Sequence, residues 1–506
     1  MADERRTPGE VKESMLTGIR WVAGARAISE VMLLASSVVL ARLIAPAEFG
    51  QAIVALLIAN IAGVLASHAF ASLLIQQDEI SEDDIRTAVA LNVGIGLVLS
   101  LVVFALAAPL SAAFGAGEPG LIRAVSPVCL LAGINAVPSA MLQRRLDFPR
   151  LSMIGVASQV TQIAVAVSLA IAGAGAAAIV AGALAAQLVS TAAAVLVYRP
   201  PLPRVRREAA RRLTGFGAPT ALSSLVFTAF QNVDYAVIGA RLNPVQLAYY
   251  FRAYQYGVDY QRKISQILVD MAFPVFSRLG SHDEIRAVRA RIVRIHVAVI
   301  FPMLAGYAAL APTLVPWLLG ARWEPVVVPS QYLTVAGAVT AVLTGTGALL
   351  VAMGRPGLIL GWNVGHLICY GLMVYLIAPR GIVTVAAAVA GFYILQGLAA
   401  HWFLLRRVVG IPMRDLFREL AGACTGCAAL VACAATLRAL LAGAGFPSVV
   451  TLAVAGSVGL GAYLVTMRFA FSGTWSDLAL LARRLMRREA RPPTPADLPR
   501  AETAVT

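Results

Sequence analysis

The stretch VALLIANIAGVLASHAFASLLI, from Val54 to Ile75, is almost continuously apolar. A helix that crosses the hydrocarbon core of a membrane needs about 20 such residues. A membrane β-barrel would instead show segments of about ten residues that alternate between apolar and polar. Similar apolar runs recur from Gly18 almost to Phe471 with only short breaks. The sequence therefore predicts an all-α integral membrane protein with no soluble domain between its spans.

Composition supports the same class. The chain has 506 residues, of which 59% are hydrophobic and 13% charged, whereas soluble domains carry about 25% charged residues. The net charge of +15 does not indicate a nucleic-acid partner, because the basic residues lie in short connections between spans. The five cysteines fall inside apolar runs, and Cys424 and Cys427 have no second pair to complete a zinc site. We expect no metal and no cofactor.

The apolar runs predict about fourteen spans. They lie near residues 17–42, 47–75, 86–113, 121–142, 150–172, 176–198, 214–242, 245–277, 292–319, 325–352, 357–378, 382–405, 415–440 and 447–470.

Basic residues fix the expected orientation. Alternate connections are rich in arginine, among them QRRLDFPR and RPPLPRVRREAARRL, while the connections between them, such as LIAPAE and GARWEP, are short and poor in charge. Basic loops stay on the cytoplasmic side of a membrane, so we expect both termini there. The connection QQDEISEDDIRT is acidic although it falls on the basic side, and acidic residues contribute little to orientation.

A short repeat suggests a duplicated fold. ARLIAPAEFG begins at Ala41 and ARLNPVQLAYY begins at Ala240, each at the outer end of a span that opens a set of six. Duplicated halves are common in transporters. The expected parts are a cytoplasmic N-terminus (1–16), a six-helix bundle (17–198), a basic linker (199–213), a second six-helix bundle (214–408), two further spans (409–471) and a basic amphipathic tail that ends in a disordered segment (472–506).

The expected eighth span carries a line of polar side chains. At about 100° per residue, six residues fall close to one line along the helix: Arg252, Tyr256, Asp259, Lys263, Gln266 and Asp270. Arg262 lies to one side of that line, and Arg262 and Lys263 stand near the middle of the membrane. A charged side chain there costs about 2.5–3.5 kcal/mol on insertion scales, so we expect these side chains to face a cavity or a partner.

Pairing within a helix offers a simpler explanation for part of this charge. Asp259 is spaced i,i+3 and i,i+4 from Arg262 and Lys263, so it can neutralise one of them but not both. Arg26 and Glu30 in the first span have the same i,i+4 spacing. A self-contained pair and a cavity-facing role are equally good interpretations there.

Together these positions predict a cationic centre with acids above and below it. A central Arg and Lys suit an anionic headgroup such as a phosphate or diphosphate. The candidate substrate-binding residues of the central cavity are Arg252, Arg262, Lys263, Asp259, Tyr256, Gln266, Arg26 and Glu30. The candidates for ion coupling are Glu30, Asn232, Asp234 and Asp259.

The aromatic residues of YYFRAYQYGVDY admit two interpretations. Tyr249 and Tyr250 begin the span and fit an interfacial belt. Tyr254, Tyr256 and Tyr260 lie deeper, where tyrosines beside a polar line could contact sugar rings.

Several segments in order resemble a known family. They are LARLIAPAEFG at the end of the first span, QNVDYAVIGARL followed by LAYYFRAY, FPVFSRL, LLGARWEPVVVPSQYL and the MGRP turn. This combination resembles the bacterial oligosaccharide flippases, the polysaccharide transport branch of the multidrug/oligosaccharidyl-lipid/polysaccharide exporter superfamily, over roughly residues 15–470. QRKIS, from Gln261, departs from the more apolar stretch typical of that family.

The resemblance implies two six-helix bundles related by a pseudo-twofold axis, a V-shaped central cavity and two extra C-terminal helices. It also implies transport of a polyprenyl-diphosphate-linked oligosaccharide from the cytoplasmic to the outer leaflet of the bacterial cytoplasmic membrane by alternating access. The implied partners are that lipid-linked substrate, the bilayer and other membrane proteins of polysaccharide assembly.

Three other functions remain open on sequence. A multidrug cation antiporter of the same fold would use Glu30, Asp234 and Asp259, but Arg262 and Lys263 would repel an organic cation. The second alternative is a flippase for a peptidoglycan precursor, which would belong to the same superfamily. A membrane polymerase or ligase is disfavoured because no outer connection carries a nucleophile, base and orienting group.

Overall fold

The computed structural model describes residues 29–68, 70–77, 79–117, 119–266, 276, 281–471, 475 and 476. Regular structure in this part of the chain is helical, with no strand. Arg26, Asp270 and the expected amphipathic tail after residue 476 lie outside the described residues.

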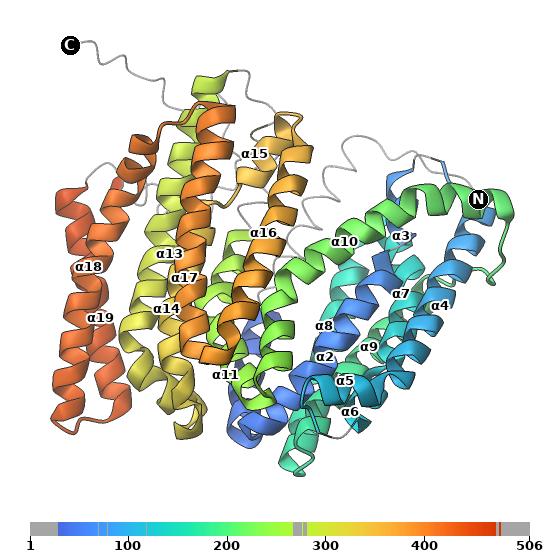
Figure 1. Cartoon of the computed structure of the whole chain (residues 1–506), viewed down its shortest axis with the longest axis horizontal. Helices are drawn as coiled ribbons and strands as arrows, with labels where there is room; N and C mark the ends of the chain where they lie inside the picture. The colour runs from blue at the N-terminus through green and yellow to red at the C-terminus, as the bar shows by residue number, and fades with distance from the viewer. Residues whose placement is uncertain are drawn as a thin grey trace.

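The first half of the chain forms helices that lie together on one side of the molecule (Figure 1). They are a helix over residues 29–43, α2 (Pro46–His68), α3 (Ala71–Gln76), α4 (Glu82–Ala105), α5 (Ala107–Ala113), α6 (Gly120–Val125), α7 (Pro127–Arg144), α8 (Phe148–Ile171) and α9 (Ala176–Val197).

The second half begins with the long helix α10 (Arg207–Arg241), which runs diagonally from the first group of helices into the second (Figure 1). After it come α11 (Pro244–Tyr254), the π-helical turn η1 (Gln255–Asp259), a helical segment over 260–266, α13 (His282–Leu319), η2 (Ala321–Val326), α14 (Val327–Val342), α15 (Thr346–Ala352), α16 (Pro356–Ile377), η3 (Ala378–Arg380), α17 (Ile382–Ala400), η4 (His401–Val409), α18 (Met413–Gly443) and α19 (Ser448–Ala470).

Eleven helical segments among the described residues are long and apolar enough to cross a membrane. The other expected spans fall on the helix over 29–43, on α10 and on α11 with the segment that follows it. The all-α membrane fold expected from the sequence is therefore confirmed. Some expected spans are divided: the run at 121–142 forms α6 and α7, which meet at Ser126 because Pro127 has no backbone N–H to donate.

Helices α18 and α19 lie beside α13 at the outer edge of the second group (Figure 1). The Tyr463 hydroxyl on α19 donates to the Ala298 carbonyl of α13 at 2.7 Å. On α18, the Glu419 carboxylate accepts from Arg289 of α13 at 3.3 Å, and both side chains are buried. These bonds anchor the two C-terminal helices to the second half of the chain.

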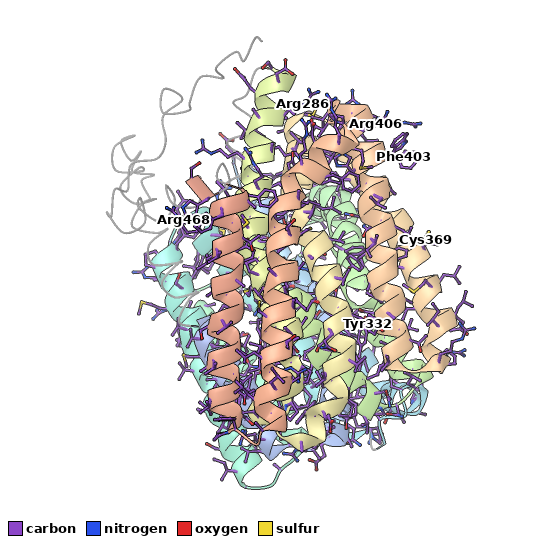
Figure 2. All side chains as sticks on the ribbon, turned by 90° about the vertical axis from the view of Figure 1, so that its left-hand side faces the viewer. Arg286, Tyr332, Cys369, Phe403, Arg406 and Arg468 are labelled. Carbon is purple, nitrogen blue, oxygen red and sulfur yellow. The ribbon has the colours of Figure 1, made fainter. Side chains whose placement is uncertain are left out.

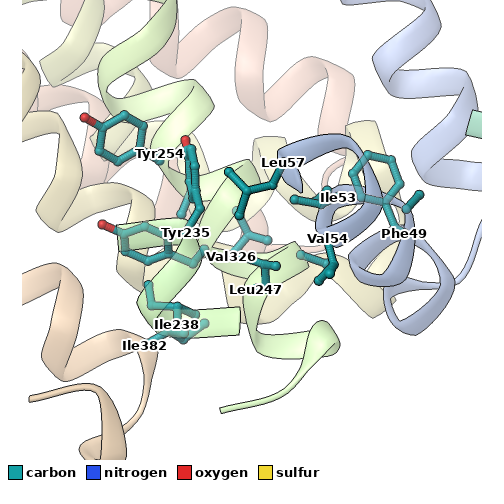
Figure 3. Packing of buried hydrophobic residues seen from close by; sticks show 14 of the residues in the cluster. Phe49, Ile53, Val54, Leu57, Tyr235, Ile238, Leu247, Tyr254, Val326 and Ile382 are labelled. Atoms are coloured by element: carbon teal, nitrogen blue, oxygen red, sulfur yellow. The ribbon is translucent and has the colours of Figure 1, made fainter. Parts of the chain in front are cut away.

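The two halves meet through an apolar core at one end of the molecule. Phe49, Ile53 and Val54 of α2 belong to the same cluster of buried side chains as Tyr235 of α10 and Leu247 of α11 (Figure 3). We call this end, which contains the turns at 44–45, 242–243 and 320–326, the closed end.

Basic residues gather at the other end, which we call the basic end. Figure 2 shows Arg286 and Arg406 there, together with Arg468. Arg286 donates to the Gly410 carbonyl at 2.6 Å, and Arg144 donates to the Leu74 carbonyl at 2.9 Å. The connections expected on the basic side thus lie at one end of the structure.

The segment expected to be a linker, residues 199–213, is helical from Arg207, so α10 takes in its second part. The reason is that this part contacts the acidic start of α4. Arg206 pairs with Asp83 at 3.6 Å, and Arg212 pairs with Asp84 at 2.8 Å. The acidic connection that departed from the charge pattern therefore pairs with two arginines of the basic segment.

Asp84 also caps its own helix. Its carboxylate accepts from the backbone N–H of Ser81, and the Ser81 hydroxyl accepts from the backbone N–H of Asp84, which is a complete capping box. Asp84 is buried, whereas the Asp83 side chain is 49% exposed. Substitution of these two neighbouring carboxylates, one buried and one exposed, therefore allows a direct comparison of their contributions to stability.

Asp84→Ala is expected to lower the free energy of unfolding by about 2 kcal/mol, because it removes a helix cap and a charge-assisted bond together. Asp83→Ala is expected to cost less than about 1 kcal/mol, as exposed ion pairs do. Thermal unfolding of the purified protein in detergent, followed by tryptophan fluorescence, measures the difference. Equal midpoints for the two variants would contradict this account of the α4–α10 contact.

Candidate functional site

The candidate site residues lie where the helix over 29–43 and α2 face α10, α11 and the segment over 260–266. The π-helical turn η1 between α11 and that segment was not expected. Gly257 lies in this turn, and a Cβ atom on Gly337 of α14 would lie 2.1 Å from its carbonyl oxygen. Two glycines therefore allow the turn to pack directly on the backbone of α14.

The turn interrupts the regular helix on which the polar line was expected. A π-helical turn bonds i to i+5 and so rotates the residues that follow it. Arg252, before the turn, contacts Ser37 and Phe49 of the first half. Arg262, after the turn, contacts Gln231 and Tyr254 of the second half. Lys263, which was expected on the line with Arg252, pairs with Glu30 of the same helix that carries Ser37, whereas Arg262, expected to one side of the line, faces the second half.

Arg252 is enclosed by the protein, with only 2% of its surface exposed. Its guanidinium donates to the Ser37 hydroxyl, to the Ser37 carbonyl at 3.0 Å and to Gln255 Oε1 at 2.9 Å. It also lies over the Phe49 ring, 4.3 Å from the centroid. These contacts join α11 to the first half near the closed end, so Arg252 does not face an open cavity in this conformation.

Arg262 and Lys263 each have a carboxylate partner. Arg262 lies 3.3 Å from Asp259, and it donates to the Tyr254 hydroxyl at 3.0 Å. Lys263 donates to Glu30 Oε2 at 2.6 Å. Asp259 thus pairs with one of its two candidate cations, and Glu30 pairs across the two halves of the chain.

These four charged side chains remain accessible. Arg262 and Asp259 are 32% and 30% exposed, and Lys263 and Glu30 are 40% and 37% exposed. An accessible ion pair contributes little net free energy, typically about 0–1 kcal/mol. A stronger anion can therefore compete with Glu30 for Lys263.

Aromatic rings surround these cations. Tyr256 and Tyr260 lie 5.7 Å apart between ring centroids, and Tyr256 lies 5.6 Å from Tyr307 of α13. The Lys263 ammonium lies 5.9 Å from the Tyr260 centroid. Tyr254, in contrast, is buried and is available only to Arg262 and its packing neighbours. Gln266 follows Lys263 and is partly exposed.

Asp234 lies in a separate buried cluster of the second half. Its carboxylate accepts from the Tyr250 hydroxyl at 3.0 Å, from the Tyr370 hydroxyl at 2.9 Å and from the backbone N–H of Tyr235 at 2.9 Å. Only 1% of Asp234 is exposed. Asn232 donates to the Thr228 carbonyl of its own helix at 2.8 Å. This cluster joins α10, α11 and α16. No pattern in the sequence marked Tyr370 as one of its members.

At the closed end the helix over 29–43 caps α13 and is capped in turn by η2. Arg42 donates to the Leu318 carbonyl at 2.9 Å, and Arg322 donates to the Ala41 carbonyl at 3.2 Å. The Trp323 indole donates to the same Ala41 carbonyl at 2.7 Å. Carbonyls at helix C-termini have no partner within their helix, so these bonds satisfy them across the two halves. The motifs ARL and GARWEP contain these residues, but no pattern in the sequence indicated that the two motifs meet.

Backbone atoms of the two halves also touch at the closed end. A Cβ atom on Gly50 of α2 would lie 1.8 Å from the carbonyl oxygen of Pro244 of α11. Only glycine allows this approach. The halves are therefore in direct contact at the closed end, and they diverge toward the basic end (Figure 1).

A family model and the curated relatives of the chain agree on a role in polysaccharide biosynthesis for the proteins that it resembles. A model of the family described as "Polysaccharide biosynthesis protein" matches residues 39–328. Teichuronic acid biosynthesis protein TuaB of Bacillus subtilis is 27% identical over 369 residues, which cover 71% of this chain and 75% of that protein. Lipopolysaccharide biosynthesis protein WzxC of Escherichia coli is 25% identical over 428 residues, which cover 81% and 85%.

The fold is similar to that of a solved flippase. The structure of lipid II flippase MurJ in an inward closed conformation aligns with a TM-score of 0.65, at 14% identity, over 92% of this chain and 99% of that one. At this identity the likeness concerns the fold alone.

Proposed function

The chain belongs to the polysaccharide biosynthesis protein family, and we propose that it moves a polyprenyl-diphosphate-linked oligosaccharide across the membrane for assembly of a cell-surface polysaccharide. The family bears out the resemblance found in the sequence. The expectation from the sequence that the protein is a multi-pass transporter, and not an enzyme, agrees with this family and with the flippase fold. The relatives are named for teichuronic acid and lipopolysaccharide biosynthesis, which supports a glycan of the cell surface as the cargo.

The orientation belongs to the same proposal. The basic end, with Arg144, Arg286 and Arg406, faces the cytoplasm, because positively charged connections are retained there. Both termini are then cytoplasmic, and the membrane is the bacterial cytoplasmic membrane. The closed end faces outward, so this conformation is the one that receives substrate from the cytoplasmic leaflet.

The observation that carries the proposal is the ion pair between Lys263 and Glu30. It joins the two halves between the closed end and the basic end, and it is accessible. A diphosphate offers more negative charge and more acceptor oxygens than one carboxylate. We expect it to displace Glu30 from Lys263 and to contact Arg262 beside it, while the lipid tail stays in the bilayer.

Displacement of Glu30 from Lys263 couples binding of the diphosphate to the conformational change that opens the cavity to the other side of the membrane. The pair holds the halves at one fixed separation, and its loss removes an interaction that favours the present conformation. Rocking of the halves then requires the closed end to separate, which breaks the bonds of Arg42, Arg322 and Trp323 across it. Asp234, buried and bonded to two tyrosines, is proposed to keep α10, α11 and α16 together as one body during this motion.

Proteoliposomes test the proposal directly. Purified wild-type protein is reconstituted with a fluorescent polyprenyl-diphosphate-linked oligosaccharide, and the label that becomes protected from an external quencher or hydrolase is measured over time. The proposal predicts movement faster than in protein-free vesicles. The absence of movement for a panel of neutral and acidic glycans on this carrier would refute it.

A further inference from the structure

A polar groove runs through the first half of the molecule, away from the charged residues described above. Its volume is about 390 Å³, within the range of about 300–1,000 Å³ typical of small-molecule sites. Helices α2, α7 and α9 and one residue of α3 form it. The lining residues that carry polar side chains are Asn60, Ser67, Asn135, Ser139, Gln143 and Gln187.

The groove follows α7 for much of the membrane thickness. Its lining residues on that helix run from Val128 to Gln143, about 22 Å at ~1.5 Å per residue. Gln143 is exposed and precedes Arg144, which donates to the Leu74 carbonyl at the basic end. The groove is therefore open toward the end that receives substrate in the proposed orientation.

Gly63 marks the floor of the groove. This glycine is buried, yet a Cβ atom added to it would meet no atom within 4 Å. Its neighbours Asn60 and Ser67, one turn before and one turn after it, lie on the same face of α2. The free space beside Gly63 is thus bordered by an amide and a hydroxyl.

The polar side chains retain capacity for hydrogen bonds. Asn135 donates to the Ser190 hydroxyl at 3.3 Å and accepts from the Ser139 hydroxyl at 3.0 Å. An amide has two N–H donors and two lone pairs, so one donor and one lone pair remain. Among the described residues, the side chains of Asn60 and Gln143 make no hydrogen bond within the protein, and both residues are exposed.

The chemistry of the lining selects the ligand class. None of its residues is charged and none is aromatic, so the groove offers nothing specific to a phosphate, a metal ion or an organic cation. Polar side chains at membrane depth are costly and usually functional. The side-chain amides and hydroxyls along the groove can each donate and accept hydrogen bonds. They therefore complement the closely spaced hydroxyl groups of a sugar, which also donate and accept.

We propose that this groove binds uncharged sugar units of the cargo through their hydroxyl groups, while the diphosphate is held by Arg262 and Lys263 of the second half. The inference rests on the proposed function and adds a second subsite to it. The first half then binds the glycan, and the second half binds the diphosphate of the lipid carrier that all such substrates share.

Gly63→Leu places an apolar side chain in the groove, since a Cβ atom at this position meets no atom within 4 Å. The matched control is Gly94→Leu on α4, where a Cβ atom also meets nothing within 4 Å and the residue is exposed. The probes are polyprenyl diphosphate without sugar and the same lipid bearing a neutral trisaccharide, each measured by binding to purified protein in detergent. Gly63→Leu is expected to weaken binding of the sugar-bearing lipid at least about tenfold, since several hydrogen bonds are lost together, and to leave the sugarless lipid unchanged.

A second variant, Gln143→Leu, removes an exposed amide of similar shape and keeps the test valid if Gly63→Leu folds poorly. It is expected to weaken the sugar-bearing probe severalfold and to leave the sugarless lipid unaffected. Equal loss for both probes, or no loss for either in both variants, overturns the groove as a sugar subsite. If the wild type binds neither probe, the proposed function fails instead, so the two failures are distinguishable.

Discussion

Gly50→Val is expected to abolish transport while the protein still inserts into the membrane. A Cβ atom at this position would lie 1.8 Å from the Pro244 carbonyl oxygen, so α2 and α11 must separate at the closed end. Overpacking costs typically about 1–3 kcal/mol, and a collision of the new side chain with a backbone carbonyl belongs to the upper part of that range. We therefore expect the population of this conformation to fall by about a hundredfold.

The distance between spin labels at Leu43 and Asn243, in a background without the five native cysteines, reports separation at the closed end. Both positions are exposed. Gly50→Val should shift the distribution to longer distances, whereas Gly94→Val, where the added side chain meets open space, should leave it unchanged. An unchanged distribution together with normal transport in Gly50→Val would show that the closed end does not open in the cycle.

Simultaneous replacement of Arg262 and Lys263 by alanine is expected to reduce transport of a lipid-linked oligosaccharide at least about a hundredfold. Hydrogen bonds to charged groups are each worth about 1.5–3 kcal/mol, and both cations remain accessible between the closed end and the basic end. The proteoliposome assay measures the rate.

Arg123→Ala is the matched control for that variant, because Arg123 lies exposed on α6 with its guanidinium over Phe104 of α4, and both residues belong to the first half. It should transport at the wild-type rate. A double variant that inserts normally and transports at the wild-type rate would remove Arg262 and Lys263 from the site.

Much of the fold could be predicted from the sequence, because each membrane helix is encoded locally. Runs such as Val54–Ile75 are long and apolar, and the basic connections alternate with neutral ones. The structure places those basic connections at one end. The spans divided at Ser126 and Leu106 could not be separated by composition alone, since apolar residues continue through each break.

The arrangement of the site was only partly predictable. The spacing of Asp259 and Arg262 within one helix indicated their pair, which the structure contains. The partner of Glu30 is Lys263, and no local spacing relates residues so far apart in the chain. The π-helical turn η1 depends on the approach of Gly257 to Gly337, which is a tertiary contact. The burial of Arg252 against Ser37 and Phe49 is likewise a contact between the two halves, which no local pattern indicates.

The charges in YYFRAYQYGVDYQRK thus serve different purposes. Arg252 stabilises the contact between the halves near the closed end, whereas Arg262 and Lys263 remain accessible to a ligand. A uniform cationic line would attract any anion from either side. We expect this separation of a buried cation from two accessible ones to confine anion binding to one depth.

The central claim is that a diphosphate competes with Glu30 for Lys263, and affinity for a short-chain polyprenyl diphosphate without sugar tests it most directly. Isothermal titration of the purified wild type, Glu30→Gln and Lys263→Gln gives the three dissociation constants. We predict that Glu30→Gln binds severalfold more tightly than the wild type, and that Lys263→Gln binds at least about tenfold more weakly, which corresponds to ~1.4 kcal/mol. Weaker binding by Glu30→Gln, or wild-type affinity in Lys263→Gln, would contradict the account.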